Sequence, residues 1–174
     1  MEISNFVPTL RTERLILRQP KENHAEAIHE LRTDEVVNKY IQRPTERKDN
    51  NGSEFIDRIN KSMAKGEIFY WIISKKNDHQ LMGSICLWNF SKNKTIAEVG
   101  YDLFPKHHSK GIMTEALDAV LSYGFHSLKL NAIEAFTHKD NSRSTHLLIK
   151  KGFVLDEKRK DLDNLNNVIF IKNN

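Results

Sequence analysis

Residues Glu98–Pro105 (EVGYDLFP), followed directly by Lys106–Ala116 (KHHSKGIMTEA), decide how this chain folds. The first segment belongs to an expected strand, Ile96 to Phe104, which Pro105 stops. The second segment is a short, polar and basic loop that leads into a long helix with an apolar and small-residue stripe on one side. The sequence therefore predicts a strand, a basic loop and a helix, in that order.

The junction between this strand and this helix is suited to bind a phosphate group. A helix N-terminus carries unpaired N–H groups and a partial positive charge. Gly111 lets the backbone bend so that several amides converge, and Lys106 and Lys110 add positive charge at the rim. An ordinary strand-to-helix turn is the alternative, because a single glycine at such a junction is not specific.

The rest of the chain is predicted to follow the order β-α-α-β-β-β-α-β-α-β-β, without repeats or low-complexity linkers. We expect Ser53 to cap the second helix and Gly152 to follow the last one. The expected strands are 14–18, 68–74, 81–90, 96–104, 132–137, 154–158 and 167–171; the expected helices are 23–38, 53–66, 113–128 and 141–151. This pattern predicts an α/β protein of the α+β type, with a mixed sheet and one domain over residues 1–174.

Composition excludes several functional classes. The chain has 174 residues, 39% of them hydrophobic, and a formal net charge of +4. The basic residues form no long block, so nucleic-acid binding is not expected. Cys86 is the single cysteine, so no internal disulfide forms and a reducing compartment fits. No leader and no apolar run of about 18 residues occurs, so we expect a cytoplasmic protein without a membrane span.

The loop resembles a known cofactor motif. Residues 108–113 (HSKGIM) resemble the acetyl-CoA motif of the GNAT superfamily of N-acetyltransferases, in which Gln or Arg, two residues, Gly, one residue and then Gly or Ala form the pyrophosphate loop. Only Gly111 matches the strict pattern. His108 replaces the Gln or Arg, Ser109 stands where many relatives have glycine, and Met113 replaces the final small residue. Backbone amides do most of the phosphate binding, so we expect binding to survive these departures.

Four segments in the same order are similar to the RimJ/RimL-like branch, which acetylates the N-termini of ribosomal proteins. They are 12–18 (TERLILR), 97–101 (AEVGY), 110–116 (KGIMTEA) and 141–153. The resemblance covers the chain from about Leu10 to past Phe153. It implies the GNAT acyl-CoA N-acyltransferase fold, in which a central, mostly antiparallel sheet is splayed at the cofactor cleft and helices cover both faces.

The same resemblance implies the position of the co-substrate, acetyl-CoA. Pantetheine would lie beside the strand that ends at Leu103, pairing with its backbone amides where this strand splays from strand 132–137. Asn141 is expected to cap the following helix and also to contact the cofactor; a role in capping alone is the alternative. The predicted cofactor-binding residues are Leu103, Phe104, His108, Ser109, Lys110, Gly111, Ile112, Met113 and Asn141.

Two residues are candidates for the chemistry, which needs a neutral amine and a proton for the leaving thiolate. Glu98 is the predicted general base, because a carboxylate on a central strand is partly desolvated and its pKa rises. Strand alternation places it on the same face as Gly100 and Asp102; a solvent-facing or salt-bridged glutamate is the alternative. Ser144, in the first turn of the helix after Asn141, is the predicted proton donor to the thiolate. Leu147-Leu148 stand where many GNAT enzymes have Leu-Tyr, and the resemblance implies that a first-turn serine replaces that tyrosine, as in RimL-like enzymes; a hydroxyl bonded to the local backbone is the alternative.

Other chemistries are weaker interpretations. Cys86 lies in an apolar strand without a visible helper, so a structural thiol is favoured over an acyl-cysteine. The histidines have no metal-ligand spacing, and no metal is expected. The acceptor stays open between a protein N-terminal amine, reached through a transient ribosomal-protein contact, and a small amine such as a polyamine or an antibiotic. A non-catalytic acetyl-CoA-binding module is a third hypothesis, and the sequence does not choose between monomer and homodimer.

Overall fold

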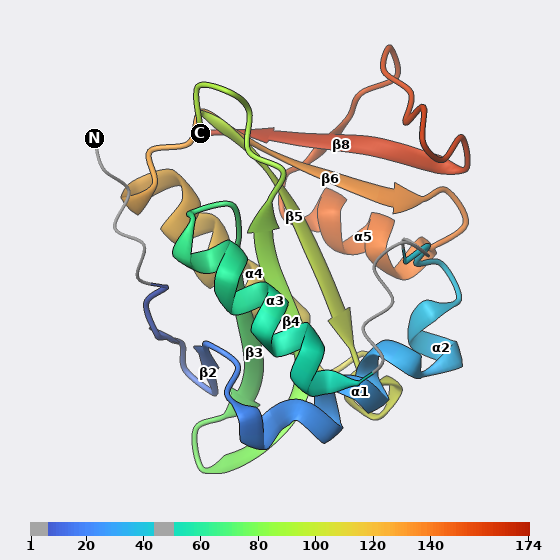
Figure 1. The fold of residues 1–174 in the computed structure, drawn as a ribbon. Coiled ribbons are helices and arrows are strands. Elements are labelled where there is room, and N and C mark those ends of the chain that lie inside the picture. The colour runs from blue at the N-terminus through green and yellow to red at the C-terminus, as the bar shows by residue number, and fades with distance from the viewer. Residues whose placement is uncertain (1–6, 44–50) are drawn as a thin grey trace.

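The predicted strand–loop–helix unit is present at the centre of the fold. In the computed structural model, which describes residues 7–43 and 51–174, strand β5 (Ile96–Leu103) passes through a basic loop into helix α4 (Ile112–Ser122). Around this unit an eight-stranded sheet carries helices on both of its faces (Figure 1). The predicted α/β class, with a mixed and mostly antiparallel sheet, is confirmed.

The sheet has the order β1-β2-β3-β4-β5-β6-β8-β7. The other strands are β1 (Leu10–Arg11), β2 (Leu15–Arg18), β3 (Phe69–Lys75), β4 (Asp78–Trp88), β6 (Ala132–His138), β7 (Val154–Leu155) and β8 (Asn167–Asn173). Every neighbouring pair is antiparallel except β5 and β6, which are parallel. Their crossover connection contains α4, as the connection between parallel strands requires.

β5 and β6 form a fork. They pair only over three residues each, Ile96–Glu98 with Ala132–Glu134. Beyond Glu98 the two strands diverge, and Figure 1 shows β5 running downward while β6 runs to the right. The predicted splay between these two strands is therefore present, and Glu98 is the last residue of β5 that pairs with β6.

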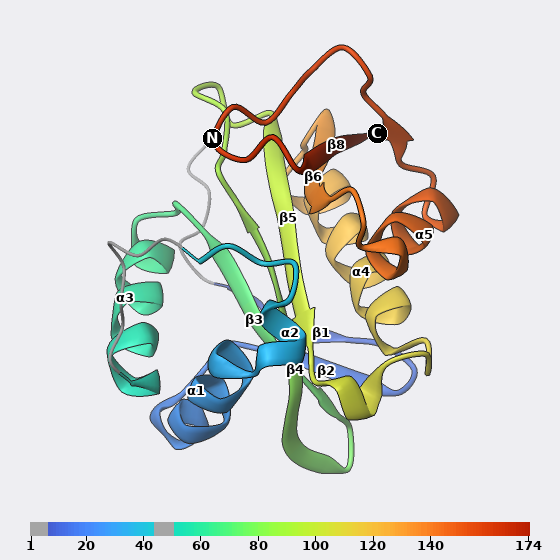
Figure 2. The same cartoon turned by 90° about the vertical axis from the view of Figure 1, so that its right-hand side faces the viewer.

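The sheet separates two groups of helices, which Figure 2 shows nearly edge-on. The helices are α1 (Ala25–Thr33), α2 (Glu35–Asn38), α3 (Gly52–Ala64), α4 and α5 (Ser142–Lys150). Helices α1 and α3 cover one face, and α4 and α5 cover the other. On the α4 side, Trp71 is fully buried and stacks edge-on against Tyr123. On the α3 side, Phe55 packs against Tyr70 of β3.

Two predicted helices differ from the structure. The predicted helix 23–38 is interrupted at Asp34, whose extended backbone ends α1 and whose carboxylate accepts the Val37 N–H (2.8 Å) to start α2. This is a capping interaction that competes with a continuous helix. The predicted helix 113–128 is α-helical only to Ser122 and continues as one π-helical turn, Tyr123–Ser127.

The predicted cap of α3 is wrong by two residues. Asn51 caps this helix, because its side-chain oxygen accepts the backbone N–H of Glu54 (3.0 Å). Ser53 lies inside the first turn and donates its hydroxyl to Glu22 instead. The loop predicted from Tyr40 to Gly52 falls partly on residues 44–50, outside the described residues. Within the described ranges, no helix is long and apolar enough to cross a membrane.

Candidate active site

The loop between β5 and α4 has the backbone geometry of an anion-binding site. Ser109 (φ 59°) and Gly111 (φ 71°) both adopt the left-handed conformation, and Gly111 is the N-cap residue of α4. No side chain of the described residues caps this helix N-terminus. The N–H groups of its first turn are therefore open to an anion, and the helix dipole favours negative charge there.

Arg14 holds this loop from the other end of the chain. Its guanidinium donates to the carbonyl oxygen of Lys110 (3.1 Å) and pairs with Glu115 of α4 (2.6 Å). Glu115 also accepts the hydroxyl of Thr12 (2.5 Å). Burial acts to raise the pKa of Glu115, but the hydrogen bonds from Thr12 and Arg14 outweigh it and lower that pKa. These contacts hold the loop through the Lys110 carbonyl and the Glu115 carboxylate, so they do not use the backbone N–H groups of the loop.

His108 is occupied by structural contacts. Its Nε2 lies 2.9 Å from the carbonyl oxygen of Leu103, and its Nδ1 lies 2.7 Å from a guanidinium nitrogen of Arg143 in α5. A carbonyl can only accept and a guanidinium can only donate, so Nε2 donates to Leu103 and Nδ1 accepts from Arg143. The side chain therefore joins the end of β5 to α5.

The other predicted cofactor residues divide into surface and core positions. The ammonium of Lys110 donates to the carbonyl oxygen of Lys106 (2.7 Å) at the rim of the loop. Ile112 and Met113 are buried in the core, so their contribution to a ligand is their backbone. The amide of Phe104 already donates to the carbonyl oxygen of Met82 (2.9 Å). Asn141 caps α5, accepting the N–H of Ser144 (3.2 Å).

Glu98 lies at the fork and has an unusual electrostatic environment. Burial raises its pKa to about 7, and the nearby carboxylates of Asp161 and Glu134 act in the same direction. The amide of Asn89 donates to Glu98 (3.2 Å) and opposes this rise. A carboxylate with a pKa near neutrality can accept a proton at physiological pH, as a general base must.

Ser144 approaches the fork from the opposite face of the sheet. Its hydroxyl lies 2.8 Å from that of Tyr101, and Ser144 is 8% exposed. Tyr101 points away from Glu98, because the two residues are three positions apart on one strand. The two predicted catalytic residues thus flank the fork from its two sides. Sequence reasoning missed Tyr101, because the contact spans 43 positions and follows no local pattern.

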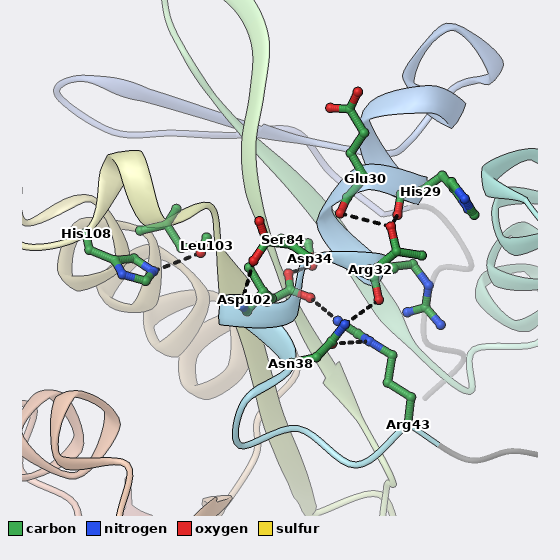
Figure 3. Close-up of polar contacts among 12 residues, drawn as sticks. His29, Glu30, Arg32, Asp34, Asn38, Arg43, Ser84, Asp102, Leu103 and His108 are labelled. Atoms are coloured by element: carbon green, nitrogen blue, oxygen red, sulfur yellow. Dashed lines mark hydrogen bonds and ion pairs between the residues drawn. The ribbon is translucent and has the colours of Figure 1, made fainter.

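Two arginines neutralise carboxylates on the face of the sheet that carries Glu98. Asp102 pairs with Arg43 (3.0 Å) and accepts the hydroxyl of Ser84 (2.5 Å), and Figure 3 shows these three side chains converging from separate elements. Glu134 of β6 pairs through both oxygens with Arg159, from the segment between β7 and β8. Arg159 was not singled out as a site residue from the sequence.

The structure disfavours a covalent acyl-cysteine. Burial, with a smaller contribution from the Asp102 carboxylate, raises the pKa of the Cys86 thiol to about 12. The thiol is then protonated at neutral pH, and a protonated thiol is a poor nucleophile. Among the described residues, no three His, Cys, Asp or Glu side chains gather as a metal-binding group.

Comparison with known proteins agrees with this geometry. The family profile of the acetyltransferase (GNAT) domain matches residues 14–154, most of the chain. This chain belongs to the GNAT family. YoaA of Bacillus subtilis (strain 168), described as an uncharacterized N-acetyltransferase, is 32% identical over 156 residues, which cover 84% of this chain and 82% of YoaA.

Solved GNAT structures share the whole fold. The ribosomal-protein-S5-alanine acetyltransferase of Vibrio fischeri superposes with a TM-score of 0.79 at 20% identity, covering 96% of this chain and 97% of that one. RimJ of Mycobacterium smegmatis, in complex with CoA-disulfide, gives 0.79 at 18% identity, covering 97% and 88%. This GNAT protein is therefore an acyltransferase, an acetyl-CoA-dependent N-acetyltransferase. The uncapped amides at the N-terminus of α4 fit the pyrophosphate of that donor.

Proposed function

We propose that this GNAT enzyme, with residues 1–174 as one domain, acetylates the α-amine of a protein N-terminus, of the ribosomal-protein type. The observation that carries this proposal is the pKa of Glu98, raised to about 7. An α-ammonium has a pKa of about 8, and a lysine ammonium one of about 10.4. A base with a pKa near 7 removes a proton from the first at little cost, whereas deprotonating lysine is unfavourable by more than three pKa units.

Glu98 acts as the general base in this proposal. Acetyl-CoA supplies an activated acetyl group, as a thioester, to the fork between β5 and β6. Glu98 accepts a proton from the acceptor ammonium through a bound water, and the neutral amine then attacks directly. No acyl-enzyme is needed, in agreement with the raised pKa of the Cys86 thiol.

Ser144 serves the leaving group from the other side of the fork. Its hydroxyl gives a proton to the thiolate sulfur as the carbon–sulfur bond breaks, and it is restored by the second proton, which the nitrogen loses as the amide forms. The Tyr101 hydroxyl holds the serine oxygen (2.8 Å). Tyr101 remains protonated, because burial raises its pKa to about 12. A proton acceptor on one face of the sheet and a hydroxyl donor on the other match the two proton movements of acetyl transfer.

Placing the thioester of acetyl-CoA at the fork also assigns residues to the rest of the cofactor. We infer that the backbone of residues 108–113 binds the pyrophosphate, while Leu103, Phe104 and Asn141 lie beside the pantetheine. Support for a ribosomal acceptor comes from the four RimJ/RimL-like segments and from the shared fold with the Vibrio fischeri ribosomal-protein-S5-alanine acetyltransferase. A small-molecule amine is the competing acceptor.

Intact-mass analysis tests the proposal. The protein and acetyl-CoA are incubated with three acceptor sets: peptides with a free α-amine and no lysine, N-terminally blocked peptides with one lysine, and small amines such as spermidine. We expect a 42 Da addition on the first set alone. Modification of the small amines alone would contradict the proposed acceptor. Binding of acetyl-CoA without turnover on any set would indicate a non-catalytic module.

A further inference from the structure

Three carboxylates lie together on one face of the sheet at the fork. Glu98 and Glu134 are register partners on the parallel strands β5 and β6, so their side chains point to the same side. Asp102 is four residues beyond Glu98 on β5 and shares this face. Gly100 stands between Glu98 and Asp102, and the Cys86 sulfur and the Trp88 indole nitrogen lie 3.4 and 3.6 Å from the position that a Cβ would take there.

Two of these carboxylates are already compensated by arginines. The side chain of Asp102 is 9% exposed and pairs with Arg43, and that of Glu134 is 13% exposed and pairs with Arg159. Both arginines come from segments outside the sheet strands. A planar guanidinium bonded through two nitrogens to one carboxylate, as in the Arg159–Glu134 pair, is an orienting and specific contact.

Glu98 is the exception among the three. Its hydrogen-bond partner is the amide of Asn89, and it forms no ion pair within the described part of the chain. Asp161 adds negative potential from the β7–β8 segment, but its carboxylate accepts amide N–H groups from Asn167 and Asp163. An incoming cation therefore meets Glu98 uncompensated, with an arginine-neutralised carboxylate on either side.

We propose that Arg159 is a specificity-determining residue: by keeping Glu134 neutralised beside Glu98, it disfavours acceptors that carry a second positive charge next to the reacting amine. This inference rests on the proposed role of Glu98. A second ammonium next to the amine would meet the paired guanidinium of Arg159 and no free carboxylate. The repulsion between the Arg159 guanidinium and a second ammonium would weaken the binding of acceptors that carry one.

The test compares two acceptor peptides that differ only at the second residue, leucine or lysine, each with a free α-amine. The measured quantity is the ratio of kcat/KM for the lysine peptide to that for the leucine peptide. The wild-type protein should favour the leucine peptide. In Arg159→Gln, Glu134 becomes an unpaired carboxylate, and the ratio should rise by about twofold to fivefold, the size expected for one partly exposed charge pair.

Three further variants separate charge from structure. Lys158→Gln removes a neighbouring positive charge that makes no side-chain contact with Glu134, and it should leave the ratio unchanged. Glu134→Gln leaves Arg159 with its longer contact to Asp156 (4.0 Å), which compensates its charge less, and should lower the ratio below wild type. The double variant Arg159→Gln/Glu134→Gln removes both charges and should return the ratio to the wild-type value, even if overall activity falls.

The outcomes also distinguish this inference from the proposed function. An unchanged ratio in Arg159→Gln, or an equal rise in Lys158→Gln, would overturn the role of Arg159 while leaving α-amine acetylation intact. If neither peptide is acetylated, the proposed acceptor is wrong, and the same variants are then compared with butylamine and 1,4-diaminobutane. A rise in the diamine-to-monoamine ratio in Arg159→Gln would support the inference; no rise would overturn it.

Discussion

The hydroxyl groups of Tyr101 and Ser144 lie 2.8 Å apart and connect β5 to α5 beside the fork. β5 and β6 no longer pair at this level, so the contact spans the region where backbone hydrogen bonds between the two strands have ended. Tyr101 belongs to the strand and Ser144 to the first turn of the helix. Both are placed by regular structure, which gives the pair a fixed geometry.

Removal of the Tyr101 hydroxyl should lower turnover without weakening cofactor binding. Tyr101→Phe keeps the aromatic ring but leaves the Ser144 hydroxyl without its partner, so we expect kcat to fall by about tenfold at unchanged KM for acetyl-CoA. Ser144→Ala should cost at least as much. The double variant should be no slower than Ser144→Ala, because the two groups act as one unit. Independent, multiplying losses in steady-state kinetics would show that the pair is not coupled.

Glu98→Gln should remove the acid limb of the pH–rate profile. The pKa of Glu98 is about 7, so the carboxylate is protonated below that pH and inactive as a base, and activity should rise as pH passes through 7. The glutamine variant should lose about 100-fold in kcat at pH 8, a usual size for general base catalysis. Its affinity for acetyl-CoA, measured by calorimetry, should be unchanged. A variant that kept the wild-type profile would falsify the assignment of Glu98 as the base.

Asn89 should set the pH at which the acid limb of the pH–rate profile lies. Its amide donates to the Glu98 carboxylate and so stabilises the ionised form, lowering the pKa. Asn89 has a left-handed backbone (φ 49°), so Asn89→Gly removes the hydrogen bond without adding backbone strain. The pKa of Glu98 should rise in this variant, and the acid limb should move to higher pH. A limb that stayed in place or moved to lower pH would show that Asn89 does not act on the base.

Local sequence patterns were sufficient to predict the β5–loop–α4 unit and the face of the sheet that carries Glu98. Alternation along β5 placed Glu98 on the face of Asp102, and Gly111 marked the start of α4; both follow from residues that are near neighbours in the chain. Competing local caps were harder to resolve, because Asn51 and Ser53 lie two residues apart and both can cap a helix.

Contacts between distant segments could not be predicted. The Tyr101–Ser144 pair joins residues 43 positions apart, and the Arg159–Glu134 pair joins residues 25 positions apart. Each depends on how α5 or the β7–β8 segment packs against the sheet, which no single-segment periodicity encodes. The sequence therefore predicted the face of the sheet on which the Glu98 side chain lies. It did not predict which residues surround that side chain and shift its pKa.

The last prediction concerns the backbone of the phosphate loop. Gly111 (φ 71°) and Gly152 (φ 77°) are both left-handed glycines at helix ends, Gly111 before α4 and Gly152 after α5. A leucine at either position is strained by about 1–2 kcal/mol, so both variants should lose stability by similar amounts in thermal unfolding. They should differ in cofactor binding, because only Gly111 lies in the loop that we propose binds the pyrophosphate.

Calorimetry with acetyl-CoA separates the two effects. In Gly111→Leu the strain is relieved by rotating the loop, which turns its amides away from the ligand and should weaken affinity by about tenfold or more. In Gly152→Leu the added side chain meets the flexible ammonium end of Lys172 (2.9 Å from the position of a Cβ), away from this loop, and affinity should stay at the wild-type value. Equal losses in both variants would mean that destabilisation alone weakens binding. Native affinity in Gly111→Leu would mean that the pyrophosphate binds elsewhere.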